Sequence, residues 1–237
     1  MAYGSVSVDS SVTSWGDTSA GLYGFKNRII NGAFTVSQYN GTSASANTIN
    51  GYFIDRWSVL QSVTGKLIAQ QNAGSATTPA GFPNYLGVTS QSAYTLLASD
   101  IYWIRQGIEG FNVADLNWGT ASAQTVTLSF WVQSSLTGTF GGAFYNNAGN
   151  RSYPFTYTIA SANTWQQVSI VVPGDTTGTW EKTTNSGLWL SFGLGVGSTY
   201  SGTAGSWSAG NYRSATGATS VVGTSGATFY ITGVQLE

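Results

Sequence analysis

The sequence predicts an all-β chain, organised as a jelly-roll β-sandwich with an extended N-terminal arm. The segment TVTLSFWVQS, Thr125–Ser134, alternates apolar and polar residues, and such alternation indicates a strand with one face in a core. Further short apolar segments follow one another along the chain between Gly, Ser, Asn and Pro turns, with few helix-length patterns. Many short strands at such spacing are typical of a sandwich or jelly roll.

The arm is expected over residues 1–26, because residues 1–24 are rich in Ser and Gly with scattered aromatic residues. Such a segment has little apolar surface with which to fold alone. It either folds back on its own domain or anchors the chain in a larger assembly, and we favour anchoring. Tyr3, Trp15 and Tyr23 are then the candidate anchoring residues.

Residues 27–237 are expected to form one sandwich domain. Val113–Leu116 should form one helical turn, and Ser201–Gly226 a long Gly, Ser and Thr loop. Loops of this length are usually functional or held in an assembly. The expected strands are Gly32–Val36, Phe53–Leu60, Lys66–Gln70, Tyr85–Val88, Tyr94–Leu97, Ile101–Ile108, Thr125–Gln133, Thr139–Tyr145, Tyr153–Ile159, Gln166–Val172, Leu188–Leu194 and Thr228–Val234.

The same alternation predicts which aromatic side chains point away from the core. Trp131, Trp189 and Tyr230 each lie on the polar side of their strand. If the three strands share a sheet, these rings form a platform among Ser, Thr and Gln, and such a surface suits sugars. Trp207 and Tyr212, on the long loop, are further candidates for glycan contacts. The alternative, which the sequence favours, is that these aromatic rings are buried under a loop or against another subunit.

Composition narrows the range of partners. Charged residues make up 7% of the chain and its net charge is −1, so nucleic acid is not expected as a partner. A surface of Gly, Ser, Thr, Asn and Gln suits a protein that packs against copies of itself or other proteins. No apolar stretch reaches the length of a membrane span, and the N-terminus lacks the pattern of a secretory signal.

Catalysis and cofactors are not expected. The chain has no Cys and no His, so a thiolate metal site is excluded and a Ser nucleophile lacks its usual base. Glycoside hydrolysis needs two carboxylates across a cleft, whereas the acidic residues are scattered singly. Asp55 beside Arg56 is interpreted as a structural ion pair. Calcium could bind oxygen ligands in loops, but no EF-hand spacing exists, and NTIN, NNAGN and TTNSG are better interpreted as turns.

Six segments, in order, resemble a known family. They are NRIINGAFTVSQ (Asn27–Gln38), IDRW (Ile54–Trp57), IRQGIEG (Ile104–Gly110), VTLSFWVQSSLTGTF (Val126–Phe140), WQQVSIVVPGDTTGTW (Trp165–Trp180) and FYITGVQLE (Phe229–Glu237). Together they resemble a β-rich domain of phage tail fibres and related virion appendage proteins. That domain is similar to jelly-roll carbohydrate-binding modules, whose first strand often carries Asn-Gly-x-Phe, here Asn31, Gly32 and Phe34.

The resemblance covers residues 27–237 and implies a non-enzymatic phage virion protein, assembled in the host cytoplasm. We expect a head decoration, head fibre or short tail fibre attached by its arm to other virion proteins, with adhesion to host-surface polysaccharide as an additional role. A homotrimer would suit the family. The alternative function is a carbohydrate-binding adhesin module that acts in host recognition at the tail.

Overall fold

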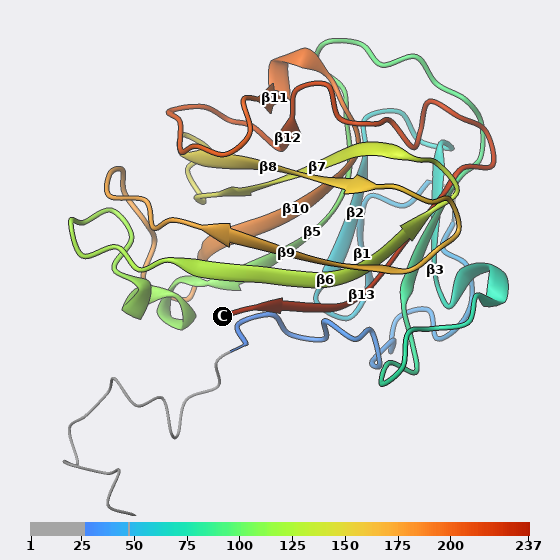
Figure 1. Cartoon of the computed structure of the whole chain (residues 1–237), viewed down its shortest axis with the longest axis horizontal. Coiled ribbons are helices and arrows are strands. Elements are labelled where there is room, and N and C mark those ends of the chain that lie inside the picture. The colour runs from blue at the N-terminus through green and yellow to red at the C-terminus, as the bar shows by residue number, and fades with distance from the viewer. Residues whose placement is uncertain (1–26, 47) are drawn as a thin grey trace, which may run out of the picture.

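The computed structural model describes residues 27–46 and 48–237 as two antiparallel β-sheets packed face to face (Figure 1). This is the predicted all-β, jelly-roll sandwich. The predicted arm, with Tyr3, Trp15 and Tyr23, lies outside the described residues. Within those residues, no helix is long and apolar enough to cross a membrane.

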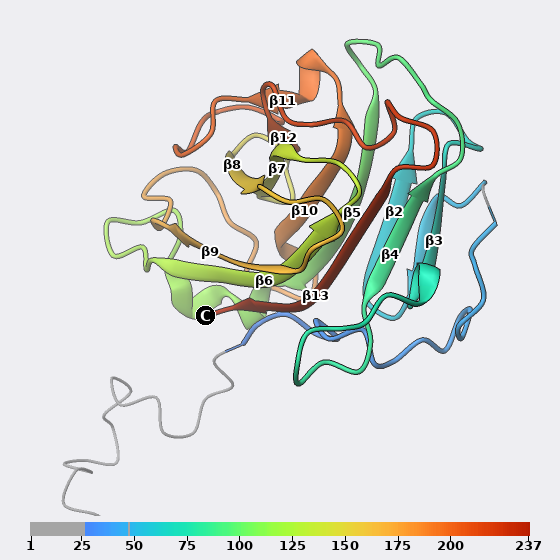
Figure 2. The ribbon, with the colours of Figure 1, turned by 45° about the vertical axis from the view of Figure 1, so that its right-hand side comes forward.

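Each sheet combines pairs of consecutive strands with strands that are distant in sequence (Figure 2). The six-stranded sheet contains, in spatial order, β1 (Gly51–Ile54), β2 (Trp57–Gln61), β5 (Ile101–Glu109), β10 (Ser186–Val196), β7 (Gly138–Tyr145) and β8 (Ser152–Ile159). The five-stranded sheet contains β3 (Leu67–Gln71), β4 (Leu86–Ser90), β13 (Thr228–Leu236), β6 (Val126–Ser134) and β9 (Gln166–Val172). The helical segments among the described residues are the 3₁₀ turns η2 (Ala73–Ser75), η3 (Gly110–Asn112), η4 (Ala114–Leu116) and η5 (Ser198–Tyr200).

The core lies between the two sheets. It contains the apolar residues that alternate with polar ones along the predicted strands. Val126, Leu128 and Phe130 of β6 are buried, and the intervening side chains are half-buried. Phe130 meets Phe192 of β10 across the sandwich at a ring-centroid distance of 5.0 Å, in an edge-to-face arrangement. The alternation therefore predicted the inner faces of both sheets correctly.

The predicted strand Gly32–Val36 is wrong, because the chain turns at Asn31 and Phe34. Both residues have positive φ, 57° and 54°. The Asn31 side chain instead closes a local turn, because its amide donates to the Val36 carbonyl and its Oδ1 accepts from the Val36 N–H. Gly32 is required here, since a Cβ at this position would lie 2.0 Å from the Val234 carbonyl oxygen. Phe34 is thereby placed in the core, 5.2 Å from the Trp57 ring.

The predicted strand Phe53–Leu60 is divided by a tight turn at Asp55 and Arg56, where Arg56 has φ 72°. The predicted ion pair between these two residues is also wrong. Arg56 pairs with Glu109 at 2.6 Å, and Asp55 accepts a hydrogen bond from the Gln38 N–H. Burial acts to raise the pKa of Glu109, but the hydrogen bond and charge of Arg56 outweigh it and hold that pKa below its ordinary value.

Two further differences concern the loops. Tyr94–Leu97 is not a strand; Tyr94 donates one backbone hydrogen bond to Val222. The predicted loop Ser201–Gly226 contains β11 (Ser201–Gly202) and β12 (Ser214–Ala215). This loop packs on the outer face of the six-stranded sheet, where Gly141 and Gly193 leave room for the Ser214 side chain. The predicted helical turn at Val113–Leu116 is confirmed as η4.

Candidate functional site

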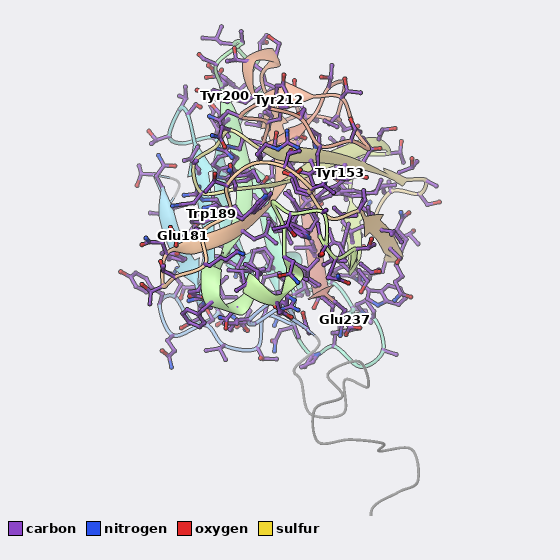
Figure 3. The ribbon with its side chains drawn as sticks, turned by 90° about the vertical axis from the view of Figure 1, so that its left-hand side faces the viewer. Tyr153, Glu181, Trp189, Tyr200, Tyr212 and Glu237 are labelled. Atoms are coloured by element: carbon purple, nitrogen blue, oxygen red, sulfur yellow. The ribbon has the colours of Figure 1, made fainter. Side chains whose placement is uncertain are left out.

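The three predicted platform residues do not share a sheet. Trp131 and Tyr230 lie on β6 and β13, neighbouring strands of the five-stranded sheet, and both point to its outer face. Trp189 lies on β10, in the six-stranded sheet, and points to the opposite side of the sandwich (Figure 3). A single platform of all three rings therefore does not form. Alternation predicts the face of a strand but not the sheet to which the strand belongs.

Tyr230 lines a pocket at one end of the outer face of the five-stranded sheet. The pocket has a volume of about 480 Å³. Loop 74–77, strands β6 and β13, and the turn before β9 surround it. We call it the Tyr230 pocket; its lining residues are Gly74, Ala76, Thr77, Gln133, Ser135, Asn163, Trp165, Thr228 and Tyr230.

The aromatic wall of the Tyr230 pocket is held in place by its neighbours. The Tyr230 ring packs against Tyr85 at 5.0 Å, and Tyr85 meets the edge of Trp165 at 5.6 Å. Trp165 Nε1 donates to the Thr77 carbonyl at 2.7 Å. The Tyr85 hydroxyl donates to the Ala73 carbonyl and accepts from the Ala76 N–H, while burial raises its pKa. These contacts fix the rings in advance of any ligand, which lowers the entropic cost of binding.

Glycine at position 87 is part of this arrangement. Gly87 faces Tyr230 across β4 and β13. A Cβ at Gly87 would lie 3.0 Å from the Tyr230 ring, so the absence of a side chain lets the ring lie close against the strand. The ring is consequently 9% exposed, with its remaining accessible surface at the pocket.

Polar groups in the Tyr230 pocket are unused by the described protein. The Gln133 and Asn163 side-chain amides and the Tyr230 hydroxyl make no hydrogen bond within residues 27–46 and 48–237. Gln133 is nevertheless 5% exposed. A nearly buried amide without a protein partner is poised to bond a ligand or water. The pocket thus offers aromatic rings together with free amide and hydroxyl groups.

Trp131 extends the same outer face beyond the pocket. It stands two residues from Gln133 on β6 and lies between Gln167 of β9 and Thr232 of β13. Its side chain is half-buried. Trp131 therefore lies between polar residues of the two neighbouring strands, and its contact with a glycan stays a prediction.

Trp207 is placed in a cluster of three indoles. It lies 5.2 Å from Trp118 and 5.3 Å from Trp180, in both cases edge to face. Its Nε1 donates to the Pro173 carbonyl at 2.6 Å. These contacts tie the long loop to the loops before β6 and after β9, which gives Trp207 a structural role.

Tyr212 likewise fixes the long loop. A Cβ at Gly202 or Gly210 would lie 2.4 or 2.5 Å from its ring, so the ring packs closely against both glycines. Figure 3 places Tyr212 of the long loop and Tyr200, the last residue of η5, above Trp189. Tyr212 is half-buried by this packing. Contact of Tyr212 with a ligand stays a prediction.

Six acidic side chains of the described chain, that of Asp55 included, have hydrogen-bonding or ion-pair partners. Asp175 pairs with Arg151, Glu109 with Arg56 and Asp115 with Arg28. Asp100 accepts from the Leu97 N–H, and Glu181 from the N–H groups of Lys182 and Thr183. No cluster of acidic residues that could hold a metal ion is found in the part of the chain that the structure describes. The NNAGN segment is a turn closed by Asn146, as predicted.

Comparison with known proteins finds resemblance at the level of structure. No family model and no curated protein matches the sequence. The enzymatically active domain of tailspike protein 4 from bacteriophage CBA120 aligns with 89% of this chain at 13% identity and a TM-score of 0.48, but this chain spans only 21% of that protein. The TmCBM61 module in complex with β-1,4-galactotriose gives 12% identity and a TM-score of 0.41, with coverage of 89% of this chain and 97% of the module.

A sugar-binding protein of Bacteroides thetaiotaomicron gives 12% identity and a TM-score of 0.45, with 89% of this chain and 99% of that protein covered. The chain thus resembles carbohydrate-binding modules and a phage tailspike domain. Because these TM-scores lie below 0.5, the function proposed below rests on the side chains of the chain itself.

Proposed function

We propose that this chain is a carbohydrate-binding jelly-roll module that holds a glycan in the Tyr230 pocket and performs no chemistry on it. The observation that carries the proposal is the combination, in one pocket, of fixed aromatic rings with amide and hydroxyl groups that have no partner in the described protein. A sugar presents an apolar C–H face and polar hydroxyl edges, and this lining complements both.

The proposed binding mode assigns a role to each kind of residue. Trp165 and Tyr230 contact the C–H face of one sugar unit, and Gln133 and Asn163 bond its hydroxyls. Trp131, further along the outer face, contacts the next unit of the chain. The volume of about 480 Å³ lies within the usual range for small-ligand sites. Hydrolysis is not part of the proposal, because no carboxylate lines the pocket.

Replacement of Trp165 by Ala is expected to weaken glycan binding by about tenfold or more, since stacking on a fixed ring contributes about 1 kcal/mol beyond its buried area. Tyr230→Phe removes only the hydroxyl and should weaken binding by a smaller factor of about five. A glycan array identifies the ligand and titration calorimetry measures its affinity. Tyr39→Ala is the matched control, because Tyr39 is 80% exposed and remote from the pocket lining. Wild-type protein that binds no glycan, or a Trp165→Ala variant with unchanged affinity, would contradict the proposal.

We further propose that the module is displayed on a phage particle, as a homotrimer anchored to other virion proteins by residues 1–26. The support is the ordered set of six segments that resembles phage appendage domains. This role and the glycan-binding role are compatible, since an anchored module leaves its outer faces free to adhere.

Deletion of residues 1–26 is expected to abolish incorporation into particles and to leave glycan binding intact, because the described residues that line the Tyr230 pocket all lie between positions 74 and 230. Particles produced from a genome with the deletion are purified and probed for the protein. The triple variant Tyr3→Ala, Trp15→Ala, Tyr23→Ala tests whether the aromatic residues carry the anchoring. Unchanged occupancy of the particles by the deleted protein would refute anchoring by the arm.

A further inference from the structure

A second cluster of aromatic residues lies on the outer face of the six-stranded sheet, opposite to the Tyr230 pocket. It consists of Trp103 and Arg105 on β5, Tyr145 on β7, Trp189 on β10 and Arg213 just before β12. We call it the arginine cluster. Register places Trp189 between Gly107 of β5 and Tyr145 of β7, and Gly107 leaves room for the indole. Figure 3 shows Trp189 on this side of the molecule.

Two guanidinium groups stack on the three rings of the cluster. The Arg105 guanidinium carbon lies 4.2 Å from the Trp189 ring centre and 5.1 Å from that of Trp103. The Arg213 carbon lies 3.6 Å from the Tyr145 ring and 5.4 Å from that of Trp103. The Trp189 and Tyr145 rings are nearly parallel, with an interplanar angle of 8°. Stacking of this kind fixes the plane of each guanidinium.

The positive charge of the arginine cluster has no acidic partner. The other arginines, Arg28, Arg56 and Arg151, each form an ion pair with a carboxylate. Arg105 and Arg213 form none within the described residues; their one side-chain hydrogen bond runs from Arg105 to the Tyr145 hydroxyl, at 3.4 Å. Burial lowers the pKa of Arg213 and the Arg105 charge lowers it further, against the opposite influence of Tyr145 and Tyr200. Two unneutralised charges side by side favour an anion between them.

Some hydrogen-bond donors of the cluster are buried and others are not fully buried. Arg105 Nε, Arg213 Nη1 and the Trp103 indole N–H are buried without a hydrogen-bond acceptor, in contact with the aromatic faces. The Nη2 atoms of both arginines have no acceptor among the described residues either, and they are not among the fully buried atoms. Gly149, at φ 65°, borders the Arg213 head, since a Cβ there would lie 3.3 Å from its Nη2. The Asn147 side chain borders Trp189, whose Nε1 donates to it at 3.3 Å.

We propose that the arginine cluster is a second binding site, separate from the Tyr230 pocket, and that it takes the carboxylate of an acidic sugar unit such as a uronic or sialic acid. The Nη2 groups of Arg105 and Arg213 each donate a charge-assisted hydrogen bond to the carboxylate oxygens. The exposed part of Trp189 and the Asn147 amide contact the sugar ring. We infer that the anion is a saccharide carboxylate from the proposed carbohydrate-binding function. The inference that the site binds an anion depends on the arginine cluster alone.

The test uses the full-length protein and paired probes. Oligomers of galacturonic and glucuronic acid and sialylated oligosaccharides are arrayed beside their carboxyl-reduced, neutral counterparts. We expect the wild-type protein to bind at least one acidic oligomer about tenfold or more tightly than its neutral counterpart. The double variant Arg105→Gln, Arg213→Gln should lose this preference, and Arg105→Lys, Arg213→Lys should retain only part of it. Binding of the acidic oligomer should weaken as NaCl is raised from about 50 to about 500 mM.

Controls separate this site from the pocket and from a general effect of charge. Lys182→Gln removes an exposed positive charge on a loop and should leave the acidic preference unchanged. Trp165→Ala, in the pocket, should weaken neutral binding and retain the acidic preference. Equal binding of acidic and neutral oligomers by wild-type protein would overturn the second site and leave the proposed function standing. Acidic preference that survives in the folded Gln double variant would overturn the assignment to this cluster, and thermal unfolding shows that the variant is folded.

Discussion

Replacement of Asp175 by Asn is expected to lower the free energy of unfolding by about 3–5 kcal/mol, because it leaves the partly buried Arg151 guanidinium without its counter-charge. The Asp175 side chain is 2% exposed and that of Arg151 16%. The pair is bidentate, at 2.7 and 2.6 Å, and the hydrogen bond with Asp175 raises the pKa of Arg151 above its ordinary value. Asp175 also accepts from the Thr177 N–H and hydroxyl, so the substitution loosens the loop that carries Trp180.

Urea-induced unfolding, followed by tryptophan fluorescence, measures this change. The control is Asp115→Asn, which removes a bidentate pair of the same type with Arg28. The Asp115 side chain is 68% exposed, and exposed pairs contribute about 1 kcal/mol or less. Similar losses in the two variants would show that burial does not determine the strength of these pairs.

Phe34→Ala should destabilise the protein by about 3–5 kcal/mol, the usual cost of truncating a buried Phe. Phe34 is fully buried and packs on Trp57, which in turn lies 6.4 Å from Phe192 in the centre of the core. Truncation would leave a cavity that the surrounding rings fill only in part. Alanine at φ 54° carries about the same backbone strain as phenylalanine, so the measured loss reports packing.

Val171→Ala is the matched control for Phe34→Ala. Val171 lies on the edge strand β9 and is 64% exposed, so its truncation should cost about 0.5 kcal/mol or less. Thermal and urea unfolding of the three proteins provide the comparison. A small loss in Phe34→Ala would mean that the segment from Asn27 to Val36 is only loosely attached to the sandwich.

The sequence predicted strands well wherever one face is buried, because alternation is a local signal. The predicted bounds Gln166–Val172 coincide with those of β9. The prediction of strands from the sequence failed where a single side chain overrides the local pattern. The turn closed by the Asn31 amide and the positive φ of Phe34 and Arg56 depend on contacts with distant segments, which periodicity does not contain.

Part of the candidate site could be predicted. Alternation along the strands placed Trp131 and Tyr230 outside the core, and the structure places both on the outer face of the five-stranded sheet, with Tyr230 in the pocket. Trp165 and Gln133 were missed as ligand contacts because they join Tyr230 through pairing of β6 with β13 and packing of loop 74–77, which connect positions far apart in sequence. The arginine cluster had a local signal, because Trp103 and Arg105 are two residues apart on β5 and lie on the same face. The positions of Tyr145 and Arg213 beside them depend on the order of strands in the sheet, which the local pattern does not contain.

The attachment of the first described residues has a mechanical consequence. Asn27 Oδ1 accepts from the Leu236 N–H, Arg28 N–H donates to the Leu236 carbonyl, and Gly32 accepts from the Val234 N–H. All three bonds join the segment to β13, which is the middle strand of its sheet. A tensile force applied from the N-terminal side would therefore enter the sandwich through a strand that is paired on both edges.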